Sequence, residues 1–276
     1  MGLGPFDLTG GPFLLFYGVL VCLAWAASLP IAEALRAQGR PGRIGREDDL
    51  AALAGGPVRL AETALVKLLA NGKVVQQGRQ QFMAIDRNGG TTAVERAILL
   101  IANPASWSAI QRAVTAEFSE VEQRLVANGL MLDRDQRLRL QLAVTAPLAF
   151  ALIFVATILI VGVDRDQPVG LLVVALIITT LLAVLRFVRT GRTTHEGEVL
   201  LSEERVRCER LRRAPQRNEM GQSVALFGTA VLAGSVLANF YEMRRELIAL
   251  IPYGWSEGGS AEAGDSGCSG GCGGGD

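Results

Sequence analysis

Two cysteines near the C-terminus have a spacing that could bind a metal ion. Cys268 and Cys272 are separated by three residues, so their thiolates could hold a soft metal or form a local disulfide. A tetrahedral zinc site needs four ligands, and no second pair lies near the first, because Cys22 lies in an apolar run and Cys208 in a charged segment. We therefore predict no metal site and no cofactor, and keep Cys268 and Cys272 as the only candidate ligands.

Acid–base chemistry has few candidate residues in this sequence. His195 is the single histidine, which excludes a histidine dyad and a metal site built from several histidines. We find no phosphate-binding glycine loop, serine nucleophile elbow or zinc-protease motif. Glu33 is the only acid within the long apolar runs, and it lies at the end of one, where a surface position is the default. We therefore predict no catalytic residue and no enzymatic activity.

The overall charge argues against a nucleic-acid partner. The chain has 27 basic and 27 acidic residues, whereas nucleic-acid binders usually carry a basic excess. Half of the residues are hydrophobic and the mean hydropathy is +0.31, values that some soluble proteins also reach. The informative feature is that the apolar residues are grouped in long blocks.

Three of these blocks predict transmembrane helices. They cover residues 13–34, 141–163 and 168–188, and each can cross about 30 Å of hydrocarbon at a rise of about 1.5 Å per residue. Only a short polar turn joins the second and third blocks, which predicts a transmembrane helical hairpin. A cleaved signal peptide is the alternative for the first block, but residues 2–12 contain no lysine or arginine to form a basic n-region.

A fourth uncharged run, residues 222–241, is rich in Gly, Ala, Ser and Thr. Its insertion into a bilayer is therefore less favourable than that of the Leu, Ile and Val runs. Two alternatives stay open: a fourth span, or a helix that lies on the membrane or on the other helices.

Arginine placement predicts the orientation. Arginines follow the first block, precede the second and follow the third, and they include Arg36, Arg40, Arg43, Arg46, Arg134, Arg137, Arg139, Arg186, Arg189 and Arg192. The opposite ends carry only Arg165. The positive-inside rule then places the N-terminus and the 164–167 turn outside, and residues 36–140 in the cytoplasm.

The 36–140 insert shows an internal repeat. A helical stretch over residues 57–70 starts with Pro57, ends at Asn71-Gly72 and leads into an apparent hairpin of short extended stretches. A second helix ends at Asn128-Gly129, and Leu130–Leu132, a DRDQ turn and Leu138–Leu140 then suggest another hairpin. We therefore predict two winged-helix-like modules, at about 44–87 and 92–140.

A winged helix raises the possibility of DNA binding, which the local charge disfavours. The helix before the second hairpin carries Glu117, Glu120 and Glu122 against Arg124, and these acids would face phosphates. A protein partner or self-association is the favoured role of the insert.

The remaining segments follow the third span. Residues 190–221 form a charged cytoplasmic segment with a helix that starts at His195, which we interpret as a capping or surface residue. Residues 222–253 hold the ambiguous apolar helix. Residues 254–276 have a Gly/Cys/Ser composition that cannot bury a core and predicts disorder.

The chain resembles a family of uncharacterised bacterial membrane proteins that have a conserved N-terminal region and a low-complexity Gly/Cys-rich C-terminal tail. The resemblance is carried by LAGGPVRLAETALVKLLANGKV at 53–74, the helical hairpin, ALFGTAVL at 225–232 and GCSGGCGGGD at the end. The tail here is shorter than is common in that family. The resemblance implies the architecture and adds no mechanism.

Together these observations predict a mainly α, polytopic membrane protein with three or four transmembrane helices and a small α+β cytoplasmic insert. Residues 1–35 form the first span and residues 141–189 the hairpin. The expected location is the bacterial inner membrane, and the expected partners are the lipid bilayer and a protein or a second copy. The alternatives are a membrane-anchored DNA-binding regulator and a subunit of an oligomeric transporter.

Overall fold

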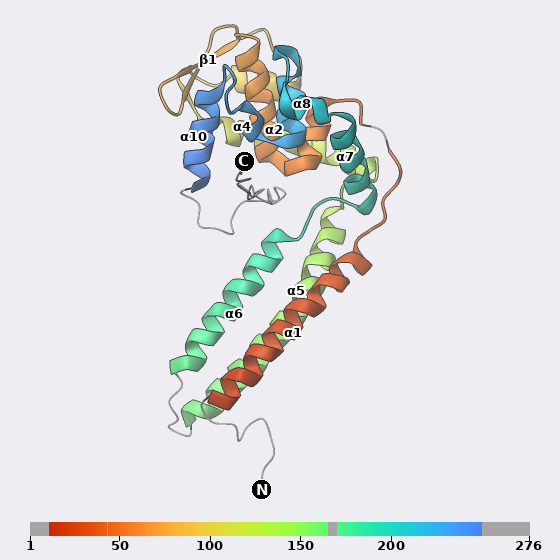
Figure 1. Cartoon of the computed structure of the whole chain (residues 1–276), viewed down its shortest axis with the longest axis vertical. Helices are drawn as coiled ribbons and strands as arrows, with labels where there is room; N and C mark the ends of the chain where they lie inside the picture. Colours follow the sequence, from red (N-terminus) through yellow and green to blue (C-terminus); the bar gives the residue numbers. More distant parts are fainter. Residues whose placement is uncertain (1–10, 43, 165–169, 250–276) are drawn as a thin grey trace, which may run out of the picture.

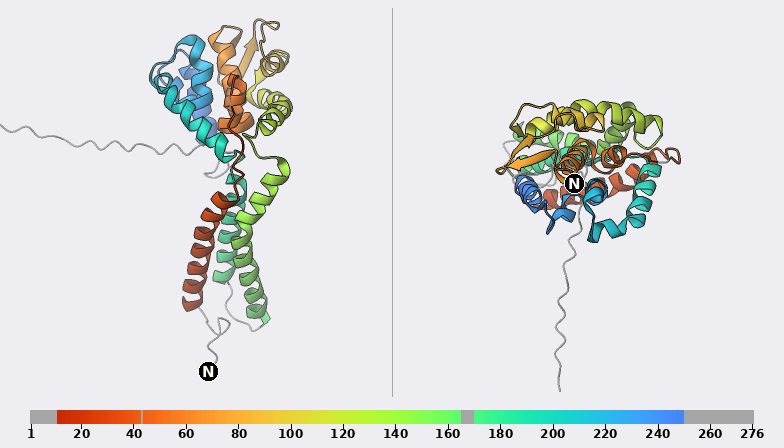
Figure 2. Two further views of the ribbon diagram at one scale, coloured as in Figure 1. Left: turned by 90° about the vertical axis from the view of Figure 1, so that its right-hand side faces the viewer. Right: turned by 90° about the horizontal axis from the view of Figure 1, so that it is seen from above.

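The computed structural model describes residues 11–42, 44–164 and 170–249. The chain is mainly helical with a few short strands. Figures 1 and 2 show an elongated molecule in which three long helices carry a rounded domain at one end. We call the three helices the stalk, and residues 44–132 and 193–249 together the head.

The stalk consists of α1 (Gly11–Leu35), α5 (Arg134–Asp164) and α6 (Gly170–Arg189), with α5 packed against both of the others. On α5 the buried residues recur every three or four positions, which gives one narrow contact stripe: Val144, Leu148, Ala151 and Val155. Two polar contacts join α1 to α6. Tyr17 and Thr179 share a hydrogen bond of 2.6 Å, and Arg186 donates to the hydroxyl and carbonyl oxygens of Ser28, each at 3.2 Å.

The outer surfaces of the stalk are apolar. Large aliphatic and aromatic side chains are exposed on all three helices, among them Leu15, Val19, Leu23, Leu29, Leu142, Phe150, Ile153, Val174, Ile177, Ile178 and Leu181. By length and composition, Leu15–Leu35 and Arg134–Ile158 are long and apolar enough to cross a bilayer. Within α6, the apolar stretch Val173–Val188 is shorter.

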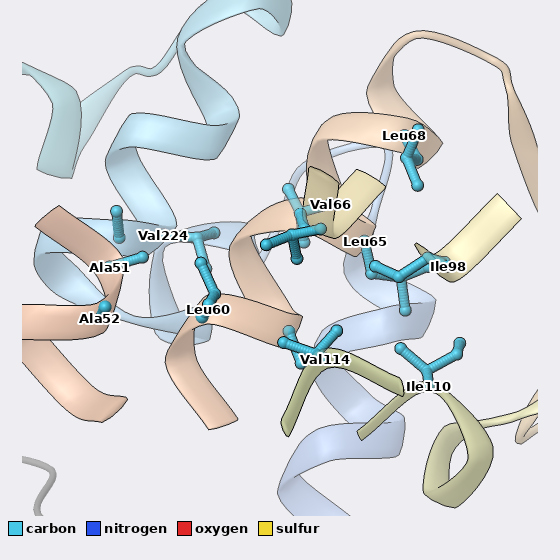
Figure 3. Packing of buried hydrophobic residues seen from close by; sticks show 14 of the residues in the cluster. Ala51, Ala52, Leu60, Leu65, Val66, Leu68, Ile98, Ile110, Val114 and Val224 are labelled. Carbon is cyan, nitrogen blue, oxygen red and sulfur yellow. The ribbon is translucent and has the colours of Figure 1, made fainter. Parts of the chain in front are cut away.

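The head is built from the segments before and after the α5–α6 hairpin. Its elements in chain order are α2 (Glu47–Ala70), β1 (Val74–Gln77), β2 (Gln81–Ala84), α3 (Ala93–Leu99), β3 (Ala105–Ser106), α4 (Trp107–Ala127), α7 (His195–Arg207), α8 (Glu209–Arg213), the 3₁₀ turn η1 (Arg217–Glu219), α9 (Met220–Phe227), η2 (Thr229–Leu232) and α10 (Ala238–Ala249). One hydrophobic core contains residues of all of them except α8 and η1. In Figure 3, Val224 of α9 lies beside Ala51 and Leu60 of α2.

The insert is therefore not a domain of its own. We expected residues 36–140 to form two modules and residues 190–253 to be separate elements, but α9 packs along α2 and contributes to the same core. Leu60 and Val224 are both fully buried. The apolar face of α2, which we expected to be buried within a small module, is covered by helices that come after α6 in the chain.

The first half of the insert agrees with the sequence prediction. Gly55 and Gly56 have non-helical dihedral angles inside α2, with φ of +63° at Gly56, and Pro57 starts the second part of that helix. Gly72 has φ of +70°, as a left-handed residue after a helix requires. The predicted hairpin is β1–β2, with Val74 opposite Ala84, and β3 extends it to three antiparallel strands.

The second hairpin prediction was wrong. Residues 138–140 lie in α5, which begins at Arg134. The DRDQ sequence is a helix start, because the Asp133 N–H donates to the side chain of Gln136 at 3.3 Å and the Asp133 carbonyl accepts from Arg137 N–H. The second helix predicted to end at Asn128-Gly129 is α4, which ends at Ala127 and has Asn128 as its C-cap.

The winged-helix prediction is likewise not supported. The chain has only one hairpin among its described residues, and that hairpin precedes α3 and α4. A wing has to follow its recognition helix, and α4 runs directly toward α5 with no strand pair between them.

The fourth apolar run is no continuous span. Gly228 and Gly234, with φ of +86° and +81°, break residues 222–241 into α9, η2 and the start of α10. Val224 and Phe240 are buried in the head. The sequence left open a fourth span or a helix that lies on the membrane or on other helices, and in the structure the run packs on other helices of the head.

Candidate functional site

The residues that the sequence marked for chemistry do not meet in the structure. Cys268 and Cys272 lie outside the described residues. His195 is an exposed first residue of α7, and the Thr194 hydroxyl caps that helix by accepting from the Gly197 N–H at 3.2 Å. Within the described ranges, no group of three or more His, Cys, Asp or Glu side chains is placed to hold a metal ion.

A charged cavity of about 510 Å³ opens on the head between the start of α2, the start of α3 and the middle of α4. We call it the head cavity. Its lining mixes both signs of charge and is formed by Arg46, Glu47, Asp48, Lys67, Thr91, Thr92, Ala93, Val94, Arg96, Glu117, Glu120, Val121 and Arg124.

Lys67 is the central cation of this site. Its ammonium nitrogen lies 3.1 Å from a carboxylate oxygen of Glu47 and 3.2 Å from one of Glu95. Glu95 is buried, and its other oxygen accepts hydrogen bonds from the Thr91 backbone N–H and hydroxyl, at 2.8 and 2.7 Å. The two ends of α2, helix α3 and the loop before α3 are therefore joined through a single lysine.

The environment shifts the pKa values of three of these groups. Burial opposes ionisation of Glu95, but the Thr91 hydrogen bonds and Lys67 outweigh it and hold the Glu95 pKa below its ordinary value. Burial also opposes the charge of Lys67, yet Glu47 and Glu95 raise its pKa. At Asp48 burial dominates and raises the pKa of the carboxyl, although a hydrogen bond with Thr92 and the charge of Lys67 act in the opposite direction.

A second ion pair closes the cavity on the α4 side. Arg124 lies 3.1 Å from Asp49 and 3.5 Å from Glu120. The inner acids Glu47, Asp49 and Glu95 each have a cationic partner from this chain. Arg96 and Glu120 at the rim are exposed. The arrangement suits a partner that presents both positive and negative groups to the rim.

A deeper ion pair holds the last helix of the head in place. The Arg244 guanidinium of α10 lies 2.6 Å from Glu62 of α2, and both side chains are almost fully buried. Arg244 also lies over the ring of Trp107, 4.6 Å from its centroid, and Arg59 lies 3.4 Å from the second oxygen of Glu62. This cluster is structural, because it binds α10 to α2 and α4.

Only one sequence feature points to the head cavity. Thr92-x-x-Glu95 has the capping-box spacing, and the Thr92 hydroxyl does accept from the Glu95 N–H. Glu47 and Lys67 are twenty residues apart, on opposite sides of the Gly55-Gly56 break, so their approach depends on the kink in α2. Helical periodicity alone could not predict that approach.

No family model matches this chain, and neither a curated protein nor a solved structure shows significant similarity to it. The role of the chain therefore has to be inferred from its own residues.

Proposed function

We propose that the chain is a non-enzymatic protein of the bacterial inner membrane, whose stalk crosses the bilayer three times and whose cytoplasmic head binds a protein partner at the head cavity. The observation that carries this proposal is the contrast between the two parts. The stalk exposes large apolar side chains on all three helices, whereas the head encloses one continuous core.

The stalk fits a bilayer better than it fits water. Exposed leucine, isoleucine and phenylalanine side chains on adjoining helices would form an apolar surface far larger than soluble monomers carry. The whole of α6, Gly170–Arg189, has 20 residues, which at about 1.5 Å each matches the thickness of the hydrocarbon layer. This length supports a third span beside α1 and α5.

The charges at the end of the stalk support a cytoplasmic head. Arg36, Arg134, Arg139 and Arg192 lie where the stalk helices meet the head. The positive-inside rule places such arginines in the cytoplasm. Because α7 to α10 belong to the head, residues up to Ala249 lie on that same side.

The head cavity supports the binding part of the proposal. Glu47, Asp49 and Glu95 are paired within the chain, and the exposed Arg96 and Glu120, of which Glu120 has only a 3.5 Å contact with Arg124, are the rim charges that a partner would meet. Surface charges of alternating sign contribute mainly to the specificity and the orientation with which a protein partner binds, and less to the affinity.

Site-specific photo-crosslinking in native membranes tests this proposal. A photoreactive amino acid at Arg96 or Glu120 of the full chain should give one discrete adduct, and the same label at the exposed control positions Arg212 and Arg245 should give none. An adduct of twice the chain mass would identify the partner as a second copy. Adducts that are absent at all four positions, or identical at all four, would refute the assignment.

A further inference from the structure

Two cavities lie where the head meets the stalk, and they share a wall. The larger, of about 650 Å³, is lined by Pro57, Arg112, Phe118, Glu122, Arg137 and Arg192, among others. The smaller, of about 370 Å³, also contains Pro57 and Arg192, and adds Val188, Glu198 and Arg205. We call the two together the junction site.

The junction site carries excess positive charge. Arg112, Arg137 and Arg192 line the larger cavity against one acid, Glu122. Arg192 and Arg205 line the smaller cavity against Glu198. Guanidinium groups are the side chains best suited to phosphate, because their planar donors match two phosphate oxygens at once.

Arg205 adds a partly buried cation to the smaller cavity. Burial lowers the pKa of its guanidinium, and the like charge of Arg59 lowers it further. Within the chain its side chain donates to the Leu226 carbonyl oxygen at 3.2 Å. An anion in the smaller cavity would offset the repulsion between these cations.

The position of the site within a bilayer identifies the source of such an anion. Arg137 lies in the first turn of α5, and Arg192 lies three residues beyond the end of α6. Beyond Arg139, exposed apolar side chains on α5 begin with Leu142, and Val188 of α6 is an exposed apolar side chain near Arg192. The arginines are therefore at the level at which the hydrocarbon ends and lipid headgroups begin.

We propose that the junction site binds the phosphate headgroup of an anionic phospholipid from the surrounding leaflet. This inference rests on the proposed membrane insertion of the stalk. Val188 would contact the upper part of an acyl chain while Arg112, Arg137 and Arg192 hold the phosphate. Since these residues come from α4, α5 and the α6–α7 connection, the lipid would fix the head to the stalk.

Native mass spectrometry of the full chain, released from detergent with defined lipids, tests the proposal. The wild-type chain should retain phosphatidylglycerol in preference to phosphatidylcholine. The triple variant R112Q/R137Q/R192Q should lose about fivefold in affinity per arginine, on the order of a hundredfold in total. The matched control R207Q/R212Q/R245Q changes three exposed head arginines outside the junction and should bind lipid as the wild type does.

Further arms separate the alternative outcomes. R112Q alone, at an exposed position, should weaken lipid binding about fivefold with an unchanged circular dichroism spectrum, so a folding defect in the triple variant would not decide the matter. Equal competition by millimolar inorganic phosphate would show a site for a soluble anion and overturn the lipid assignment. Wild-type lipid retention by the triple variant would overturn it too. Release of the wild-type chain from membranes by alkaline carbonate would instead refute membrane insertion itself.

Discussion

The buried ion pair between α2 and α10 allows a quantitative prediction. Arg244 and Arg245 are neighbours on α10, but Arg244 is 6% exposed and pairs with the buried Glu62, whereas the Arg245 side chain is 65% exposed and pairs with Glu242. Arg244→Met and Arg245→Met remove the same charge and add the same side chain. The two variants therefore differ only in the environment of the arginine.

The expected magnitudes follow from burial. Removal of one partner from a buried ion pair costs about 3–5 kcal/mol, because the other charge stays behind without compensation. Arg59, at 3.4 Å from Glu62, reduces that penalty, while the lost contact of Arg244 with Trp107 adds about 1–2 kcal/mol. We expect Arg244→Met to lower the free energy of unfolding of the head by about 3 kcal/mol. Arg245→Met should change it by less than about 0.5 kcal/mol.

Urea unfolding in mild detergent measures the difference. The chain has three tryptophans, and in a Trp25→Phe, Trp255→Phe background the fluorescence reports Trp107, which lies beside Arg244. With a slope of about 1–3 kcal/mol per molar urea, the midpoint should fall by about 1–3 M for Arg244→Met. Glu62→Gln combined with Arg244→Met should recover part of the loss, because neither charge is then buried alone. Equal midpoints for the Arg244 and Arg245 variants would refute the structural role of the pair.

Four further predictions concern the head and its cavity. A chain in which a short Gly/Ser linker joins residues 44–132 to 193–249 should be a soluble, folded monomer by gel filtration and circular dichroism. The two ends to be joined lie close together, because the Leu132 N–H donates to the Arg192 carbonyl at 2.9 Å. An aggregated product would contradict a single head. Glu95→Gln should lower the urea midpoint of this spliced head at pH 7 and leave it unchanged in strong acid, because the depressed pKa of folded Glu95 stabilises the head above the unfolded-state pKa and this stabilisation is lost as the pH falls through the folded-state pKa. Asp48→Asn should raise the midpoint at pH 7, because the raised pKa of Asp48 means that its charged form opposes folding. This gain in stability should vanish below about pH 4. Gly56→Ala should destabilise the spliced head by about 1–3 kcal/mol in urea, since φ is +63° there, and an unchanged midpoint would exclude this conformation.

Short sequence motifs predicted the structure correctly where a conformation depends on neighbouring residues. Pro57 predicted the start of the second part of α2, and Asn71-Gly72 predicted its end, because few residues other than glycine adopt a positive φ without strain. The β1–β2 hairpin followed from the short extended stretches around Gly78.

Prediction failed where the decisive contact lies far away in the chain. Leu138–Leu140 alternate as a strand would, but Leu140 lies in α5 and packs against Ile31 and Ala32 of α1, far earlier in the chain. The sequence could not decide whether the apolar run at 222–241 spans the membrane or packs on other helices, because its partner surface on α2 is about 160 residues away. The head cavity could not be predicted from the sequence for the same reason, because its ion pairs connect residues of α2, α3 and α4 that are far apart in the chain.

Cysteine accessibility on both sides of the membrane tests the central claim most directly. In a cysteine-free chain, single cysteines would replace Arg79 in the β1–β2 turn, Arg245 on α10 and Gly170 at the far end of the stalk, all three exposed. A membrane-impermeant maleimide should label Gly170→Cys in intact cells, and should label Arg79→Cys and Arg245→Cys only after the membrane is opened. Labelling of Arg245→Cys and Gly170→Cys from the same side would contradict a three-helix membrane stalk that carries one cytoplasmic head.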